Sequence, residues 1–222
     1  MIKQLRMGLK MLRYAHGIKS CIVWCVIVLL LGVLFEVGAD GSNSVFTGIY
    51  LVMMLAIWPL QLLVSLNVPN VVAASPWKKR IQTSVTALIS FCGFLIAFAV
   101  VGVMEGNKFA TGRIAAEDFT FNVLFAACFA VLLMIYMAFS TKYFVVSTIG
   151  FIIVMSSSSI VINLRQYTDL AIFHQSLHPA ATVLLGILFI IIGAVLEYGI
   201  SLLIYKVPVS KYAQMNSLRK KM

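Results

Sequence analysis

One carboxylate lies deep inside an apolar run of this chain, where a charge is costly. Glu197 stands in the run 180–204, about seven residues from its end. An ionised carboxylate at that depth in a bilayer costs about 3 kcal/mol, so it needs a partner or a wet cavity. Glu197 is therefore either a polar contact in a translocation path or between subunits, or a structural residue that pairs with Lys206 or carries a proton.

A run of hydroxyl groups is the second polar feature within an apolar segment. It comprises four serines and a following asparagine: Ser156, Ser157, Ser158, Ser159 and Asn163. Four consecutive serines cover every face of a helical turn, so at least one must face a neighbour or a cavity. They indicate either close helix packing or a path for a substrate. In the run 45–66, Pro59 predicts a kink, and Gln61 is placed to satisfy a freed carbonyl.

The sequence does not predict catalysis or a bound cofactor. His174 and His178 are one helical turn apart, but no third metal ligand accompanies them, and the four cysteines have no histidine at metal-ligand spacing. No Gly-x-x-x-x-Gly-Lys phosphate loop and no hydrolase or protease signature occurs. We expect no metal, no cofactor and no enzymatic activity in this chain, and any ATP and Mg²⁺ would be bound by a partner.

The elements that position these residues are apolar helices. The chain has 222 residues, 62% of them hydrophobic. Crossing the ~30 Å hydrocarbon core takes about twenty apolar residues, and six segments qualify: about 20–38, 45–66, 82–104, 120–140, 144–163 and 180–204. Because backbone groups in lipid must hydrogen-bond within their own segment, each is predicted to be a helix. The sequence predicts an all-α polytopic membrane protein with one transmembrane domain, 1–222.

The distribution of charge orients these segments. Of the 17 Lys and Arg residues, only Lys108, Arg113 and Arg165 fall on one side of the predicted membrane. The positive-inside rule puts the other side, which includes both termini, in the cytoplasm. The predicted cytoplasmic loops contain no acidic residue. This sorting also accounts for the net charge of +10 without a nucleic-acid partner.

The N-terminal arm has the pattern of an amphipathic helix. Ile2, Leu5, Leu9 and Leu12 recur every three or four residues, and beside them runs a cationic flank of Lys3, Arg6, Lys10 and Arg13. Such a segment is expected to lie in the membrane interface with its cations near anionic headgroups. We predict an interfacial helix over 1–18; the alternative is a cationic tail that happens to be helical.

The loop after the second predicted span combines apolar and cationic residues. Its members are Val68, Pro69, Asn70, Val71, Val72, Ser75, Pro76, Trp77, Lys78, Lys79 and Arg80. Pro69 ends the second helix, and Ser75-Pro76 reads as an N-cap followed by proline at the first helical position. Apolar residues framed by cations on the cytoplasmic side form either a docking surface for a protein or an ordinary topogenic loop.

Together these features resemble the ABC-2 type permeases of small bacterial exporters. The resemblance rests on six spans with both ends inside, an interfacial N-terminal helix, and the element 74–83, which reads Ala-Ser-Pro-Trp-Lys-Lys-Arg-Ile-Gln-Thr. It implies a dimer of permeases in the bacterial plasma membrane, with a separate ABC ATPase docked on the Val68–Arg80 loop. An amphipathic or antimicrobial peptide would be the exported substrate. Some family members engage the ATPase through an acidic residue in this loop, which this chain lacks.

Two other classes remain open at the level of sequence. The chain could be a stand-alone channel or small-molecule carrier, in which Glu197 would be essential for transport. It could also be a membrane interaction or immunity protein without transport activity. A coupled carrier usually has several buried ionisable groups, and the sequence indicates only Glu197.

Overall fold

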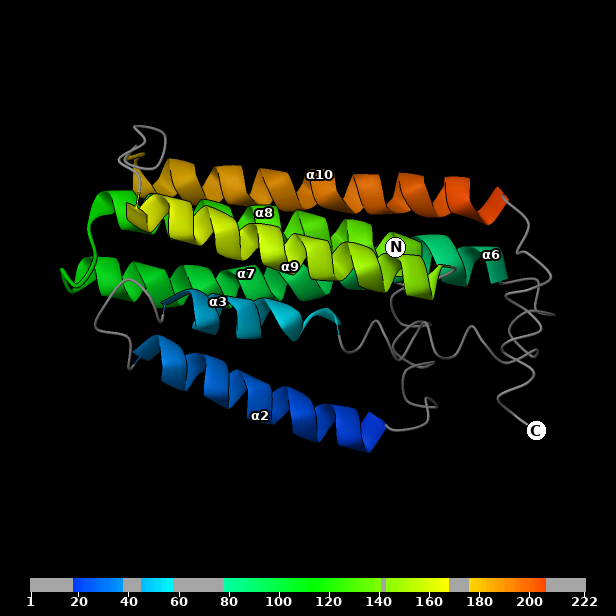
Figure 1. Ribbon diagram of the computed structural model, residues 1–222, viewed down its shortest axis with the longest axis horizontal. Helices are drawn as coiled ribbons and strands as arrows, with labels where there is room; N and C mark the ends of the chain where they lie inside the picture. The colour runs from blue at the N-terminus through cyan, green and yellow to red at the C-terminus, as the bar shows by residue number, and fades with distance from the viewer. Residues whose placement is uncertain (1–17, 38–44, 58–77, 141–142, 168–175, 207–222) are drawn as a thin grey trace.

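The structure, a computed structural model, describes residues 18–37, 45–57, 78–140, 143–167 and 176–206 (Figure 1). The helices in these ranges are α2 (Ile18–Val37), α3 (Val45–Met54), α6 (Lys78–Arg80), α7 (Thr86–Ala110), α8 (Ala116–Ser140), α9 (Phe144–Tyr167) and α10 (Pro179–Lys206). One π-helical stretch, η1 (Ile81–Val85), joins α6 to α7. No strand occurs within these ranges, so the all-helical fold is confirmed for this part of the chain.

Three of the helical segments are long and apolar enough to cross a membrane. They are Gln82–Ala110, Ala116–Ser140 and Pro179–Lys206, and they overlap the predicted third, fourth and sixth spans. Shorter apolar helices, Lys19–Phe35 and Thr148–Ile162, lie within the predicted first and fifth spans. The second predicted span, 45–66, is described only as far as Ile57. These helices are those of a membrane protein, and the number of six spans stays a prediction.

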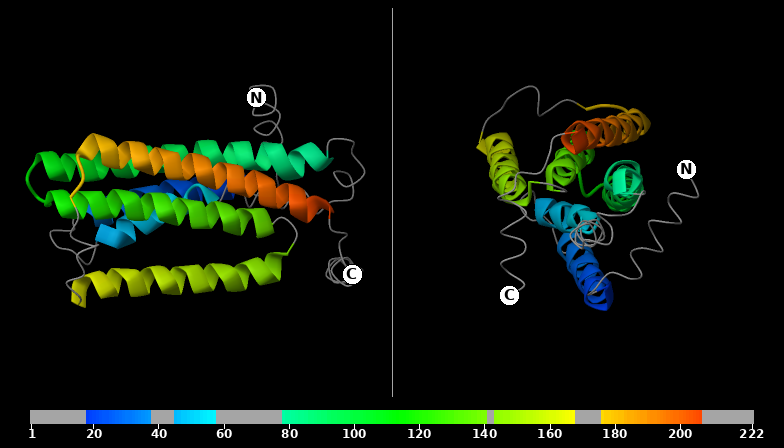
Figure 2. Two further views of the ribbon diagram at one scale, coloured as in Figure 1. Left: turned by 90° about the horizontal axis from the view of Figure 1, so that it is seen from above. Right: turned by 90° about the vertical axis from the view of Figure 1, so that its right-hand side faces the viewer.

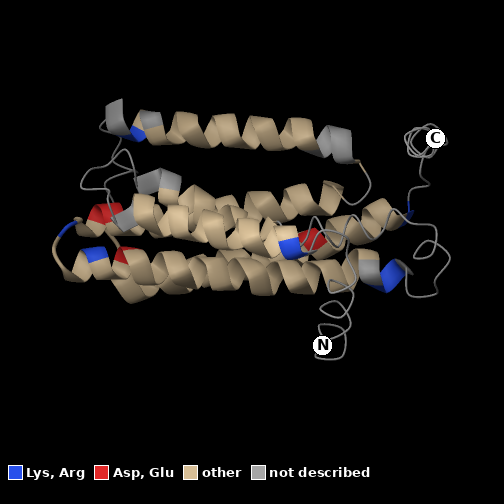
Figure 3. Cartoon of the chain, turned by 90° about the horizontal axis from the view of Figure 1, so that it is seen from below, with Lys and Arg blue, Asp and Glu red and all other residues tan. Residues whose placement is uncertain are grey.

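The helices lie roughly side by side, and α8 occupies the centre (Figures 1 and 2). It packs against α10, α7, α9 and α3, while α2 lies on the outer side of α3. Phe94 of α7 and Phe129 and Met134 of α8 are fully buried in the core between them. Figure 3 shows most of the charged residues gathered toward the two ends of the helices. The middle of the described bundle is therefore an apolar layer, as a bilayer requires.

The contact of α10 with its neighbours depends on small residues. The buried positions of α10 recur every three or four residues: Thr182, Gly186, Ile190, Gly193, Glu197, Ser201 and Ile204. A Cβ on Gly193 would lie 2.8 Å from the sulfur of Met134 and 3.3 Å from Cα of Val131, both on α8. A Cβ on Gly186 would clash with the ring of Phe98 on α7. The two glycines let α10 approach α8 and α7 more closely than any side chain would permit.

The connection between α7 and α8 is shorter than the sequence indicated. The predicted spans end at 104 and resume at 120, but α7 continues to Ala110 and α8 begins at Ala116. Gly112, with φ +70°, ends α7: its amide bonds to Phe109 O at 3.1 Å, and Arg113 N bonds to Lys108 O at 2.9 Å. This is the Schellman pattern of a helix C-terminus. Charged residues that were expected in a loop therefore lie within helices.

Gly193→Leu tests the close contact between α10 and α8. The added side chain has no room against Met134 and Val131, and overpacking of this kind costs about 1–3 kcal/mol. We expect a clear loss of thermal stability in detergent or nanodiscs. Gly199→Leu is the matched control, because a Cβ at Gly199 meets no atom within 4 Å. Equal melting temperatures for the two variants would contradict the packing described.

Candidate functional site

Many of the residues selected from the sequence lie outside the described ranges. These are Lys3, Arg6, Lys10, Arg13, Gln61, Val68, Pro69, Asn70, Val71, Val72, Ser75, Pro76, Trp77 and His174. The backbones of Lys78 and Asn163 are helical, but their side chains are not described. The interfacial helix and most of the docking loop therefore stay predictions.

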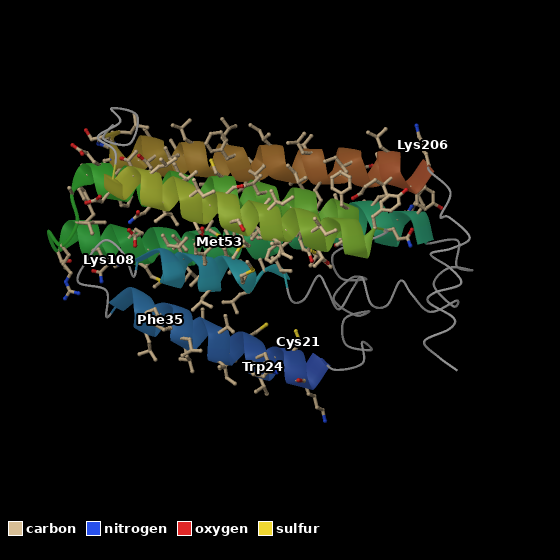
Figure 4. All side chains as sticks on the ribbon, viewed as in Figure 1. Cys21, Trp24, Phe35, Met53, Lys108 and Lys206 are labelled. Atoms are coloured by element: carbon tan, nitrogen blue, oxygen red, sulfur yellow. The ribbon has the colours of Figure 1, made fainter. Side chains whose placement is uncertain are left out.

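The end of the predicted docking loop belongs to a cationic end of the bundle. Lys79 and Arg80 of α6 are exposed, and η1, which follows them directly, packs against α10. Lys206, also exposed, ends α10 at the opposite end of the bundle from Lys108 (Figure 4). The hydroxyl of Thr83 donates to Lys79 O at 2.7 Å, which fixes the start of this helical segment. We call Lys79, Arg80 and Lys206 the cationic end.

The serine run mainly bonds to its own helix. The hydroxyls of Ser157, Ser158 and Ser159 donate to the carbonyls four residues earlier, at 2.8, 2.6 and 3.1 Å. Ser158 is buried, whereas Ser156, Ser157 and Ser159 are exposed. The expectation that at least one serine faces inward is confirmed by Ser158. Tyr50 of α3 lies near Ser158 and Ser159, so part of the run faces a side chain of α3.

A buried polar network that the sequence reading missed lies near the opposite end of α7. Glu105 is fully buried; its Oε1 accepts from Nζ of Lys108 at 3.1 Å, and its Oε2 accepts from Nδ2 of Asn122 at 2.6 Å. Residues of α3 and α7 pack beside the carboxylate and leave no room there for a water molecule. Both carboxylate oxygens are thus satisfied, one by a cation and one by an amide. The hydrogen bond from Asn122 on α8 to Glu105 on α7 ties these two helices together from within.

A second charged contact holds the same end of the bundle. Arg165, at the end of α9, forms an ion pair with Asp118 in the first turn of α8, and its guanidinium lies 4.1 Å from the centre of the Phe121 ring. The amide of Leu177, just before α10, donates to the hydroxyl of Thr120 at 3.2 Å. The start of α8 therefore binds both the end of α9 and the segment just before α10.

The buried carboxyl of α10 is not satisfied in this way. Glu197 has no solvent exposure, and neither carboxyl oxygen has a hydrogen-bond partner. Ser90 of α7 approaches the carboxyl group closely enough to interact with it. Ser201 lies one turn further along the same buried side of α10, and the hydroxyls of both serines are also without partners. We call Glu197, Ser90 and Ser201 the Glu197 group. The hypothesised pairing of Glu197 with Lys206 is not among the ion pairs of the described residues.

Residue spacing could have revealed part of these sites. Glu105 and Lys108 are three apart and would share one side of a helix if the helix were extended past 104. Glu197 and Ser201 are four apart, in register with Gly193. The sequence reading lost the first pair because it ended the span at the first charge. The partners on other helices, Asn122 and Ser90, carry no sequence signal that links them to these acids.

Within the described ranges, no three His, Cys, Asp or Glu side chains come together in a way that could hold a metal ion. Comparison with protein-family models, with curated proteins and with solved structures gave no match to this chain. The site is therefore interpreted from its own geometry.

Lys108→Met tests the network around Glu105. It leaves a buried carboxylate without its cation, and breaking a buried pair in this way costs about 3–5 kcal/mol. We expect a large fall in melting temperature. The double variant Glu105→Gln with Lys108→Met should recover most of it, because the glutamine carbonyl still accepts from Asn122. The exposed Arg113→Met is the control. A single variant as stable as the parent would show that the pair is unimportant.

Proposed function

We propose that the chain is the membrane-spanning permease subunit of an ATP-driven exporter of the ABC-2 type. In this proposal it crosses the bacterial plasma membrane six times with both ends in the cytoplasm. Two copies form the translocation path, and a separate ATPase docks on the segment Val68–Arg80. The exported substrate is an amphipathic or antimicrobial peptide.

The observation that carries the proposal is the difference between the two ends of the bundle. Lys79 and Arg80 are exposed, the following turn packs against α10, and Lys206 ends α10. The acids at the helix ends for which the structure gives side chains, Glu105, Glu117 and Asp118, belong to the end of α7 and the start of α8. A cationic end supports a cytoplasmic orientation and a surface for a protein partner.

The need for a partner follows from the lack of an energy source in the chain. The sequence has no phosphate-binding loop. In the buried pair Glu105–Lys108, both carboxylate oxygens of Glu105 accept hydrogen bonds, one from Lys108 and one from Asn122. A carboxylate held in this way suits a structural role better than a proton relay. A chain of this kind performs export only when a second protein supplies the work. This reasoning favours the exporter subunit over a stand-alone carrier.

The proposed topology predicts which positions are reachable from each side of the membrane. A membrane-impermeant maleimide added to intact cells should label Arg113→Cys, and should label Lys79→Cys and Lys206→Cys only after the cells are opened. All three positions are exposed in the structure. The parent chain is the control, because its four cysteines lie within apolar helices. Labelling of Arg113→Cys and Lys79→Cys from the same side would exclude the six-span arrangement.

The proposed partnership predicts a complex with an ATPase encoded beside this chain. The purified chain should bind that ATPase and raise its rate of ATP hydrolysis. Reversing two charges, Lys79→Glu with Arg80→Glu, should weaken binding about tenfold or more, equivalent to about 1.4 kcal/mol.

Arg113→Glu is the matched control for charge, because Arg113 is exposed and lies just beyond the far end of α7. Its affinity for the ATPase should equal that of the parent. An ATPase whose activity and sedimentation are unchanged by the parent chain would refute the proposal.

A further inference from the structure

The Glu197 group differs from the other buried carboxylate in one respect. Glu105 has Lys108 at one oxygen and Asn122 at the other. Glu197 is buried equally deeply, yet the described polar groups on its side of the interface are hydroxyls: that of Ser90 on α7, which approaches the carboxyl group, and that of Ser201, one turn further along α10. With the two carboxyl oxygens they make four oxygen atoms. All four oxygens are shielded from solvent and none has a partner. The Glu197 group therefore offers oxygen ligands and a carboxylate, and no described cation balances the negative charge.

No described charged side chain is placed to supply that charge. Among the described elements, those that pack most against α10 are α8, α7 and η1. Those elements carry charges only near the far end, namely Glu105 and Lys108 on α7 and Glu117 and Asp118 on α8, and η1 carries none. The thiols and phenol of these helices are Cys92, Cys128 and Tyr136, and on α10 itself the titratable groups besides Glu197 are Tyr198, Tyr205 and Lys206, which are exposed.

The chemistry of the site selects what can fill it. Carboxylate and hydroxyl oxygens are hard ligands, suited to small cations with little preference for nitrogen or sulfur. Because solvent reaches none of the oxygens, the ligand must be small enough to sit between them. Neutralisation also removes the cost of a lone carboxylate in an apolar layer.

We propose that Glu197, Ser90 and Ser201 bind a small monovalent cation, Na⁺ or a proton, between α10 and α7. The bound cation bridges the two helices beside η1, the π-helical stretch that leads from the cationic end into α7. Release of the cation leaves a carboxylate that is stable only in contact with water, so occupancy of the site is linked to the separation of α10 from α7. This inference does not depend on the exporter proposal, because it concerns the chain alone.

The test is the thermal stability of the purified full-length chain as a function of cation. Na⁺ is titrated against choline at constant ionic strength, with K⁺ as the competing ion, and the titration is repeated over a range of pH. If the ligand is Na⁺, the melting temperature rises by roughly 3–6 °C for each tenfold increase above the dissociation constant. If the ligand is a proton, the melting temperature rises in the same way as the pH falls and does not respond to Na⁺. Glu197→Gln should remove either dependence.

Two serine variants keep the proposal testable should Glu197→Gln fail to fold. Ser90→Ala and Ser201→Ala should each shift the midpoint concentration of Na⁺, or the midpoint pH, by about tenfold or one pH unit. Ser157→Ala is the matched control, since Ser157 is exposed and bonds only to its own helix. A parent chain indifferent to Na⁺ and pH would overturn the proposal. Midpoints unchanged in both serine variants would overturn it as well.

Discussion

The close approach of α10 to α8 and α7 is the contact on which the rest of the bundle depends. In an apolar solvent helices gain little from hiding apolar side chains, so association depends on how closely their surfaces fit. Gly186 and Gly193 supply that fit on α10, against Phe98 on one side and Met134 on the other. The same side of the helix then carries Glu197 and Ser201 toward the interior. The packing that stabilises the bundle is thus also what buries its polar groups.

Burying a carboxyl group in such a bundle requires a compensating charge or proton, and this chain treats its two buried acids differently. Glu105 is fixed by Lys108 and Asn122, so its charge is cancelled by the protein and the contact is permanent. Glu197 is approached by the hydroxyl of Ser90, whose lone pairs and single proton cannot cancel a full charge. The contacts of Glu105 therefore keep α7 and α8 in place. The stability of the Glu197 group depends on which cation lies between its oxygens.

The sequence predicted the helices well and their polar contacts poorly, for reasons that particular residues show. Long charge-free runs can only be helical in a bilayer, and three of those predicted are matched by long described helices. The helices α7 and α8 continue past the predicted span limits at 104 and 120, and Lys108 neutralises Glu105 inside α7. Glu197 was recognised from its depth alone. Its neighbour Ser90 is more than a hundred residues away, and only tertiary packing brings the two together.

The buried charges also bear on how such a chain could do work. The sequence indicated Glu197 as the sole buried ionisable group, which argued against a coupled carrier. The structure adds Glu105 and Lys108 to the buried ionisable groups. These two residues pair with each other, so they add no capacity to bind an ion or carry a proton. Among the described residues, Glu197 is then the buried acid without a partner, between α10 and the start of α7 and next to η1. Motion imposed at the cationic end would reach this site through η1 and α10, which are in contact. A cation there would set how readily α10 separates from α7, while in the proposed exporter the energy for separating them would come from the ATPase docked at the cationic end.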